Sequence, residues 1–238
     1  MNARDDAFGS WATLEGAPRP GVVIIPDVWG VADLYRRLAE RLVQAGFATH
    51  VVDPYRYTGR AGLTPATVLP FIAQLDDVRV LRAVQEAIDA LAASPAVRGQ
   101  RVGLIGFCMG GQYALLAACA CHGLSACAAF YGMVRYAAGL DPTRKPRQPL
   151  DAIADLSCPL LGLYGAEDAL IPNADVEELK RRLAQTKHAH EVHSYPGAGH
   201  AFLNDTRPDA YRPDAARDAW SRLVPFLQHQ LRAGERAS

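Results

Sequence analysis

Cys108 lies between two glycines in the segment Gly106-Phe107-Cys108-Met109-Gly110, directly after the apolar run 101–106. The pattern G-x-C-x-G is typical of a nucleophile elbow in which cysteine takes the place of serine. Such a sharp strand-to-helix turn strains the backbone and puts the thiol at a helix N-terminus, which favours the thiolate. The alternative is a small buried cysteine that lets a strand pack on a helix. The strand before and the helix after favour the nucleophile.

Two other polar residues follow predicted strands. Asp168 comes after the run 159–164, and His200, flanked by glycine-rich sequence, comes after the run 190–195. A carboxylate at a strand end can orient an imidazole, which can then take a proton from a thiol. Alone, Asp168 would more simply cap the next helix, and Glu167 is the weaker alternative for the acid. The order cysteine, acid, histidine, each after a strand, predicts a catalytic triad.

The elements that must position these residues are short apolar runs alternating with amphipathic helices. Strands are predicted at 22–26, 48–53, 101–106, 126–131, 159–164 and 190–195, and helices around 34–42, 76–91, 110–121, 173–183 and 220–231. This alternation predicts an α/β fold, with a mainly parallel sheet covered by helices on both faces. No repeat or linker divides the sequence, so residues 1–238 are predicted to form a single domain.

Two connections stand out. The stretch from Pro54 to about Leu75 is long and polar, and long connections are often functional. Residues 141–149 contain three prolines and predict an exposed loop. In parallel sheets ligands bind beyond the carboxyl ends of the strands, so the segments that follow strands should form the site.

Composition excludes several classes of function. The chain of 238 residues has 25 Lys and Arg against 25 Asp and Glu, so nothing suggests a nucleic-acid or anionic-membrane partner. No apolar run is long enough to span a bilayer, and the first twenty residues lack the apolar core of a signal peptide. Five cysteines, an odd number, predict a reduced, cytoplasmic protein. The histidines and cysteines show no metal-ligand spacing, so no metal is predicted.

Several motifs resemble the dienelactone hydrolase family. They are Gly-Phe-Cys-Met-Gly-Gly at 106–111, Gly-His-Ala-Phe at 199–202, Pro-Asp-Val-Trp-Gly at 26–30, Phe-Tyr-Gly at 130–132 and Asp168, within a resemblance from about residue 20 to 230. The resemblance implies an α/β-hydrolase fold and a cofactor-free monomer that acts on lactones and related esters. It implies a triad of Cys108, His200 and Asp168, and an oxyanion hole made by the backbone N–H groups of Met109 and Val28.

The sequence departs from the family at three places. Asp27 stands where the family has a carboxylate that interacts with the resting cysteine, glutamate in its best-known member; a cap for a helix near residue 32 is the alternative. Asn204 replaces an arginine that holds the substrate carboxylate, and Arg60 and Arg79 are the stand-ins for a second clamp arginine. Since asparagine cannot reproduce a guanidinium fork, this argues against free-acid dienelactone as the substrate. The N-terminal region is also short of the family's opening hairpin.

These observations predict a hydrolase that cleaves a small-molecule lactone or related carboxylic ester through a Cys108 thiolate and an acyl-enzyme. The residues predicted to line the substrate pocket are Trp29, Tyr55, Phe107, Tyr131, Phe202 and Asn204. One alternative is a general carboxylesterase or thioesterase. Another is a catalytically silent member of the fold that only binds a ligand.

Overall fold

The structure, a computed structural model, describes residues 1–6 and 9–232. In these residues eight strands form one sheet in the order β1-β2-β4-β3-β5-β6-β7-β8. The strands are β1 (Asn2–Asp6), β2 (Gly9–Thr13), β3 (Gly21–Ile25), β4 (Ala48–Val52), β5 (Val102–Phe107), β6 (Leu124–Phe130), β7 (Leu160–Gly165) and β8 (His190–Tyr195). β1 and β2 pair antiparallel with their neighbours and the other pairs are parallel, which confirms the predicted mainly parallel sheet.

Continuous apolar runs place the central strands. Every residue of β3, β4, β5 and β7 is buried. A strand covered by helices on both faces must be apolar on both sides, which explains why these runs lack the alternation of a half-exposed strand. The strand β8 lies at the edge of the sheet and is only partly buried.

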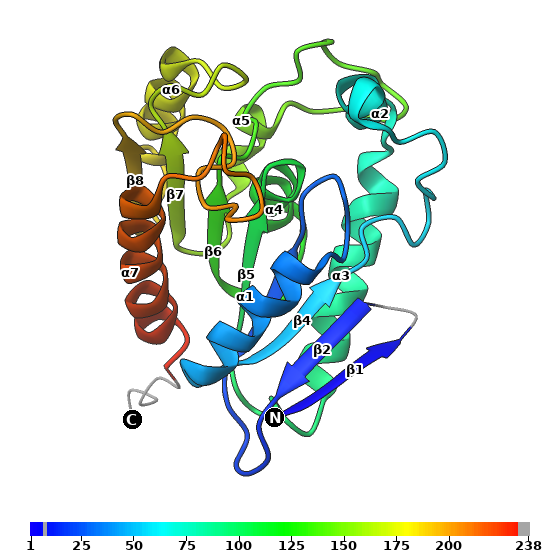
Figure 1. The fold of residues 1–238 in the computed structure, drawn as a ribbon, viewed down its shortest axis with the longest axis vertical. Coiled ribbons are helices and arrows are strands. Elements are labelled where there is room, and N and C mark those ends of the chain that lie inside the picture. The colour runs from blue at the N-terminus through cyan, green and yellow to red at the C-terminus, as the bar shows by residue number, and fades with distance from the viewer. Residues whose placement is uncertain (7–8, 233–238) are drawn as a thin grey trace.

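Helices cover the two faces of the sheet, as predicted. They are α1 (Asp33–Gln44), α2 (Val68–Gln74), α3 (Asp77–Ala93), α4 (Met109–Ala120), α5 (Pro149–Ala152), α6 (Asn173–Leu183) and α7 (Pro213–Gln230). Figure 1 shows α1 and α7 in front of the sheet and α3 and α4 behind it. The helix α4 is buried along almost its whole length, because it follows the central strand β5 into the middle of its layer.

The N-terminal residues correct one expectation. The strands β1 and β2 pair antiparallel, so the chain does have an opening two-stranded unit. The strand β2 then pairs with β4, where the ring of Trp11 stacks on that of His50 with centroids 4.0 Å apart. β1 lies at the sheet edge and is mostly polar, and β2 contains one large apolar residue, Trp11, so no apolar run marked either strand in the sequence.

The long connection from Pro54 to Leu75 contains a 3₁₀ turn, Pro65–Thr67, followed by the helix α2. Seven residues are too few to show helical periodicity, which explains why the helix was not predicted. Figure 1 shows α2 at the end of the sheet to which the arrowheads of β6 and β7 point.

The segment 141–149 is largely exposed, as predicted, but Lys145 within it is buried. Its Nζ donates to Oδ1 of Asp77 at 2.9 Å. The same carboxylate accepts the hydroxyl groups of Tyr113 at 2.9 Å and Tyr136 at 2.6 Å. A lysine whose charge is met by a carboxylate and whose ammonium group lies against aromatic rings can be buried, whatever the composition of its loop.

Candidate active site

Cys108 occupies the sharp turn between β5 and α4, with φ +56° and ψ −118°. A Cβ on Gly106 would lie 2.0 Å from the carbonyl oxygen of Gly110, and a Cβ on Gly110 would lie 2.3 Å from that of Pro26. Only glycine fits at either position, which confirms the steric reason for the G-x-C-x-G spacing. The turn puts the cysteine directly before the first residue of α4.

The three side chains predicted to act together are in hydrogen-bond contact. Sγ of Cys108 lies 3.0 Å from Nε2 of His200, and Nδ1 of His200 lies 2.7 Å from Oδ2 of Asp168. The other carboxylate oxygen of Asp168 accepts the N–H of Leu170 at 2.9 Å. The side chain of Asp168 has no exposed surface and that of His200 is 16% exposed. The carboxylate is therefore fixed from both sides, and the imidazole bridges it to the sulfur.

Backbone strain gathers at the same place. Among the described residues, the non-glycine residues with positive φ are Cys108 (56°), Tyr131 (38°) and Ala201 (63°). Ala201 follows His200, and the ring of Tyr131 lies 5.2 Å from the imidazole ring. Such conformations cost free energy and persist where the surrounding structure enforces them, most often at functional sites.

The electrostatic setting of His200 favours the imidazolium. Burial lowers the pKa of His200. Its hydrogen bonds to Asp168 and Cys108 and the charges of these two residues raise the pKa by a larger amount, so that it is about 10. The protonated ring donates through both nitrogens, so it can serve the carboxylate and the sulfur together.

Two backbone segments meet beside the thiol. Met109 is the first residue of α4, so its N–H has no partner within the helix. Val28 lies just beyond β3, which packs closely on the start of α4. The hydroxyl of Tyr55 donates to the carbonyl oxygen of Val28 at 2.6 Å and lies 3.3 Å from Sδ of Met109. Tyr55 therefore ties together the two segments that the family resemblance nominates as the oxyanion hole.

Asp27 borders the same cavity as Cys108. Its Oδ1 accepts the N–H of Trp29 at 2.9 Å, and its carboxylate also hydrogen-bonds to Tyr35. Burial raises the pKa of Asp27, against the lowering effect of these hydrogen bonds. The helix α1 has Ala32 at its N-cap with no side-chain cap, so the alternative of a helix cap is wrong.

A cavity of about 430 Å³ opens over Cys108 and His200. Of the residues predicted to line the pocket, Trp29 and Asn204 do so. The apolar part of the lining comes from Trp29, Val68, Leu69, Ile72, Met133 and Leu170. Three of these residues belong to α2, and Pro65 of the 3₁₀ turn before it also borders the cavity, so the long connection does contribute to the site.

The other predicted wall residues lie elsewhere. Phe107 and Phe202 have no exposed surface and Tyr131 has 2%. The ring of Tyr131 packs at 6.4 Å from that of Phe107 and 5.4 Å from that of Phe202, in the layer beneath the triad. The hydroxyl of Tyr55 is directed to the backbone of Val28 instead of the cavity. Aromatic residues beside a strand end are as often core as wall, and the sequence does not tell which side they face.

Sequence reasoning missed Arg207, which lines the cavity. Asn204 also lines the cavity. Its Oδ1 accepts the N–H and the hydroxyl of Thr206 at 3.0 and 2.6 Å, so this side chain stabilises the loop that contains it. Arg60 and Arg79 border other cavities and are not beside the thiol. A single arginine in a polar loop gives no signal in sequence, and only the fold shows that Arg207 turns toward the site.

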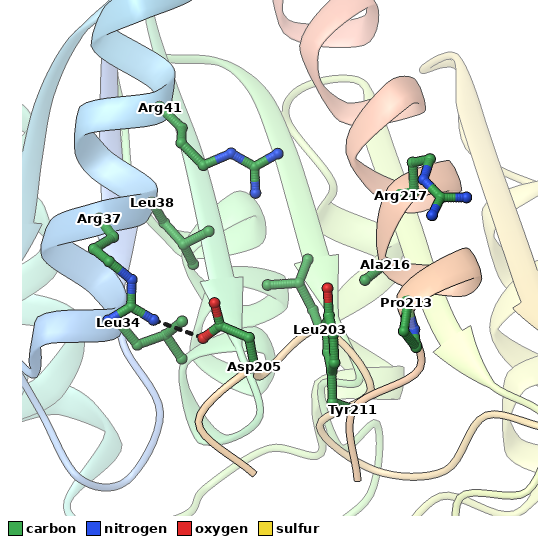
Figure 2. Close-up of a pocket in the computed structure, with 10 residues that line it drawn as sticks. All are labelled: Leu34, Arg37, Leu38, Arg41, Leu203, Asp205, Tyr211, Pro213, Ala216 and Arg217. Carbon is green, nitrogen blue, oxygen red and sulfur yellow. Dashed lines mark hydrogen bonds and ion pairs between the residues drawn. The ribbon is translucent and has the colours of Figure 1, made fainter. Parts of the chain in front are cut away.

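A second cleft, of about 270 Å³, lies between α1 and the start of α7. Figure 2 shows Arg37 directed at Asp205, with which it forms an ion pair at 2.6 Å. Asp205 borders this cleft while Asn204 borders the cavity over Cys108, so the loop after His200 separates the two. The guanidinium of Arg41 lies 3.9 Å from the ring of Trp220. The triad does not border this cleft.

The remaining cysteines do not border the cavity over Cys108. Burial raises the pKa of Cys119, Cys121 and Cys158 to about 12, and that of Cys127 well above its usual value.

No group of three or more His, Cys, Asp or Glu in residues 1–6 and 9–232 is arranged to hold a metal ion. None of the helices in the part of the chain that the structure describes could cross a membrane.

Comparison with known proteins supplies the family. The model of the dienelactone hydrolase family matches residues 9–231. The chain belongs to the dienelactone hydrolase family. It is 33% identical to a carboxymethylenebutenolidase of Rhodococcus opacus, over 90% of this chain and 82% of the relative. It is 35% identical to a Bradyrhizobium protein named "Probable 2-oxo-3-(5-oxofuran-2-ylidene)propanoate lactonase", over 89% of this chain and 84% of the relative.

Solved structures agree. A Klebsiella pneumoniae structure named "Putative Dienelactone Hydrolase" superposes with a TM-score of 0.82 at 30% identity, covering 91% of this chain and 90% of the other. The fold is thus that of a dienelactone hydrolase, an α/β-hydrolase, and the chain is a hydrolase of this family.

Proposed function

We propose that this chain cleaves a lactone or a related carboxylic ester by covalent catalysis, with Cys108 as nucleophile, His200 as acid and base, and Asp168 as the group that orients the imidazole. One observation carries the proposal: a single imidazole lies within hydrogen-bond distance of both the sulfur and the carboxylate. The names of the relatives, a carboxymethylenebutenolidase and a lactonase, support the substrate class.

Acylation begins from the thiolate–imidazolium pair. The Cys108 thiolate attacks the ester carbonyl carbon, and the π electrons move to the oxygen, where the N–H groups of Met109 and Val28 stabilise the negative charge. The tetrahedral intermediate then collapses and expels the alkoxide, which takes the proton from Nε2 of His200. In a lactone this alkoxide remains attached to the acyl chain. The product is a thioester on Cys108 and a neutral imidazole, still held through Nδ1 by Asp168.

Deacylation uses the same groups in the reverse sense. The neutral Nε2 of His200 takes a proton from water as the water oxygen attacks the thioester carbon. Collapse of the second tetrahedral intermediate breaks the carbon–sulfur bond and returns the electron pair to sulfur. The carboxylic product loses its proton to solvent, and the thiolate–imidazolium pair is restored.

The proposal is tested with Cys108→Ala and, as its matched control, Cys119→Ala, which removes a remote sulfur. Both purified variants are assayed against a panel of lactones and linear esters. We expect Cys108→Ala to lose turnover of every hydrolysed substrate and Cys119→Ala to retain it. Turnover by Cys108→Ala at the wild-type rate would contradict the assignment. Activity confined to linear esters or thioesters would contradict the lactone and favour a general esterase.

A further inference from the structure

Large apolar side chains reach the surface at few places in the described chain, and three of these places meet at the active site. The exposed large apolar residues are Met1, Leu14, Trp29, Leu69, Val78, Leu140 and Leu170. Trp29, Leu69 and Leu170, which are 41%, 53% and 43% exposed, all border the cavity over Cys108. Scattered exposed apolar residues are ordinary, but a cluster around a cavity mouth marks a binding surface.

The cluster comes from segments that are far apart in the sequence. Val68, Leu69 and Ile72 lie on α2, Trp29 follows β3, and Leu170 follows β7. Because Val68, Leu69 and Ile72 of α2 all border the cavity, the apolar lining continues from the buried Ile72 to the exposed Leu69 at the rim. An apolar group bound at Cys108 would leave water along this whole wall.

The polar side of the cavity offers little to a charged group. The amide oxygen of Asn204 already accepts two hydrogen bonds from Thr206. The guanidinium of Arg207 forms an ion pair with Asp209 at 2.6 Å, and both side chains are more than half exposed. A cation that is paired and hydrated contributes little further attraction. The apolar wall can therefore contribute more binding free energy than the side of the cavity that carries Arg207.

We propose that the wall formed by Trp29, Leu69 and Leu170 binds an uncharged hydrocarbon arm of the substrate, so that the enzyme prefers esters or lactones with an alkyl chain over compact ones and over ones that end in a carboxylate. The inference rests on the proposed hydrolytic function and specifies its substrate class. Leu69, on α2, is assigned as a residue that determines chain-length specificity.

The first test measures kcat/KM of the full-length enzyme for nitrophenyl acetate, butyrate and hexanoate, and separately for methyl, butyl and hexyl benzoates. The two series place the arm on either side of the scissile bond. Each methylene that leaves water contributes about fourfold. We expect kcat/KM to rise by about tenfold or more along at least one series. A flat or falling profile in both would overturn the proposal.

The second test compares Leu69→Ser with Leu140→Ser, whose parent side chain is also 53% exposed but does not border the cavity. We expect Leu69→Ser to lower the long-chain to short-chain ratio of kcat/KM by about three- to tenfold. The control should keep the wild-type ratio. Equal ratios in the two variants would contradict the role of Leu69.

The third test separates apolar from anionic recognition with nitrophenyl pentanoate and the nitrophenyl monoester of glutarate, which have arms of equal length. Preference for pentanoate supports the apolar wall, and preference for the glutarate monoester overturns it. Failure of the hydrolytic assignment has a different signature: Cys108→Ala would then match the wild type on every ester, whatever the chain-length profile.

Discussion

Two buried carboxylates in this molecule each face a cation, and their settings differ. Asp168 meets His200 with side-chain exposures of 0% and 16%, and Asp77 meets Lys145 with exposures of 5% and 2%. In the first pair the cation has a second partner, the sulfur of Cys108, beside an open cavity. In the second pair the hydroxyl groups of two tyrosines complete the shell around the carboxylate.

The difference separates a reactive cluster from a structural one. His200 can give a proton to a leaving group and take one up again during turnover, because its Nε2 lies beside the sulfur at the open cavity. Lys145 is enclosed between Tyr113 and Tyr136 and joins the segment 141–149 to the start of α3, so its charge has no path to a substrate. Substitution at the first pair should cost activity, and substitution at the second should cost stability.

The largest effect is expected for Asp168→Asn. The amide keeps the shape of the carboxylate but can hold His200 in the wrong tautomer and cannot balance an imidazolium charge. We expect kcat to fall about 10³–10⁴-fold on a hydrolysed ester, with a small change in unfolding temperature since His200 can become neutral. Near-wild-type kcat in a folded variant would place Asp168 outside the catalytic machinery.

Asp77→Asn should show the opposite profile. It leaves a buried ammonium group without its counter-charge, which typically costs about 3–5 kcal/mol of the free energy of unfolding. Urea unfolding measures this loss, and ester hydrolysis at low temperature measures the activity of the folded fraction. We expect that activity to stay within about threefold of wild type. A large loss of kcat without a loss of stability would erase the distinction between the two pairs.

The pH profile refines the comparison. The pKa of His200 is raised to about 10, so the imidazolium is present below that pH and is lost as the pH rises through it. Since the imidazolium protonates the leaving alkoxide, kcat/KM should fall above about pH 10. In Asp168→Asn, which lacks the carboxylate charge that helps to raise this pKa, the fall should occur at lower pH. Measurement between pH 7 and 11 checks this, and identical midpoints would show that Asp168 does not set the proton affinity of His200.

The central strands could be predicted closely because a strand that is buried on both faces has a continuous apolar sequence. The runs 22–26 and 101–106 fall within one residue of β3 and β5. The predicted strand 190–195 also coincides with β8, although β8 lies at the sheet edge and is only partly buried. The strands β1 and β2 lack such runs. Their pairing depends on partners distant in the sequence, which a local pattern does not reveal.

The candidate active site also has a part that the sequence predicts, the triad, and a part that it does not, the walls of the cavity. The elbow glycines mark Cys108 locally, and the position of His200 and Asp168 after strands marks the rest of the triad. The walls of the cavity carry no local mark. Phe107 looked like a wall residue and packs against Tyr35 in the core, with ring centroids 5.5 Å apart, whereas Leu69 on α2 gave no signal and borders the cavity.

Detection of the acyl-enzyme by mass spectrometry tests covalent catalysis most directly. The enzyme is mixed with an activated ester that it turns over, quenched in acid within one turnover and digested. We expect the mass of one acyl group on the peptide that contains Cys108, and none on those with Cys119, Cys121, Cys127 or Cys158. An enzyme that hydrolyses the ester while Cys108 remains unmodified at every quench time, including in a variant slowed by Asp168→Asn, would contradict a thioester intermediate.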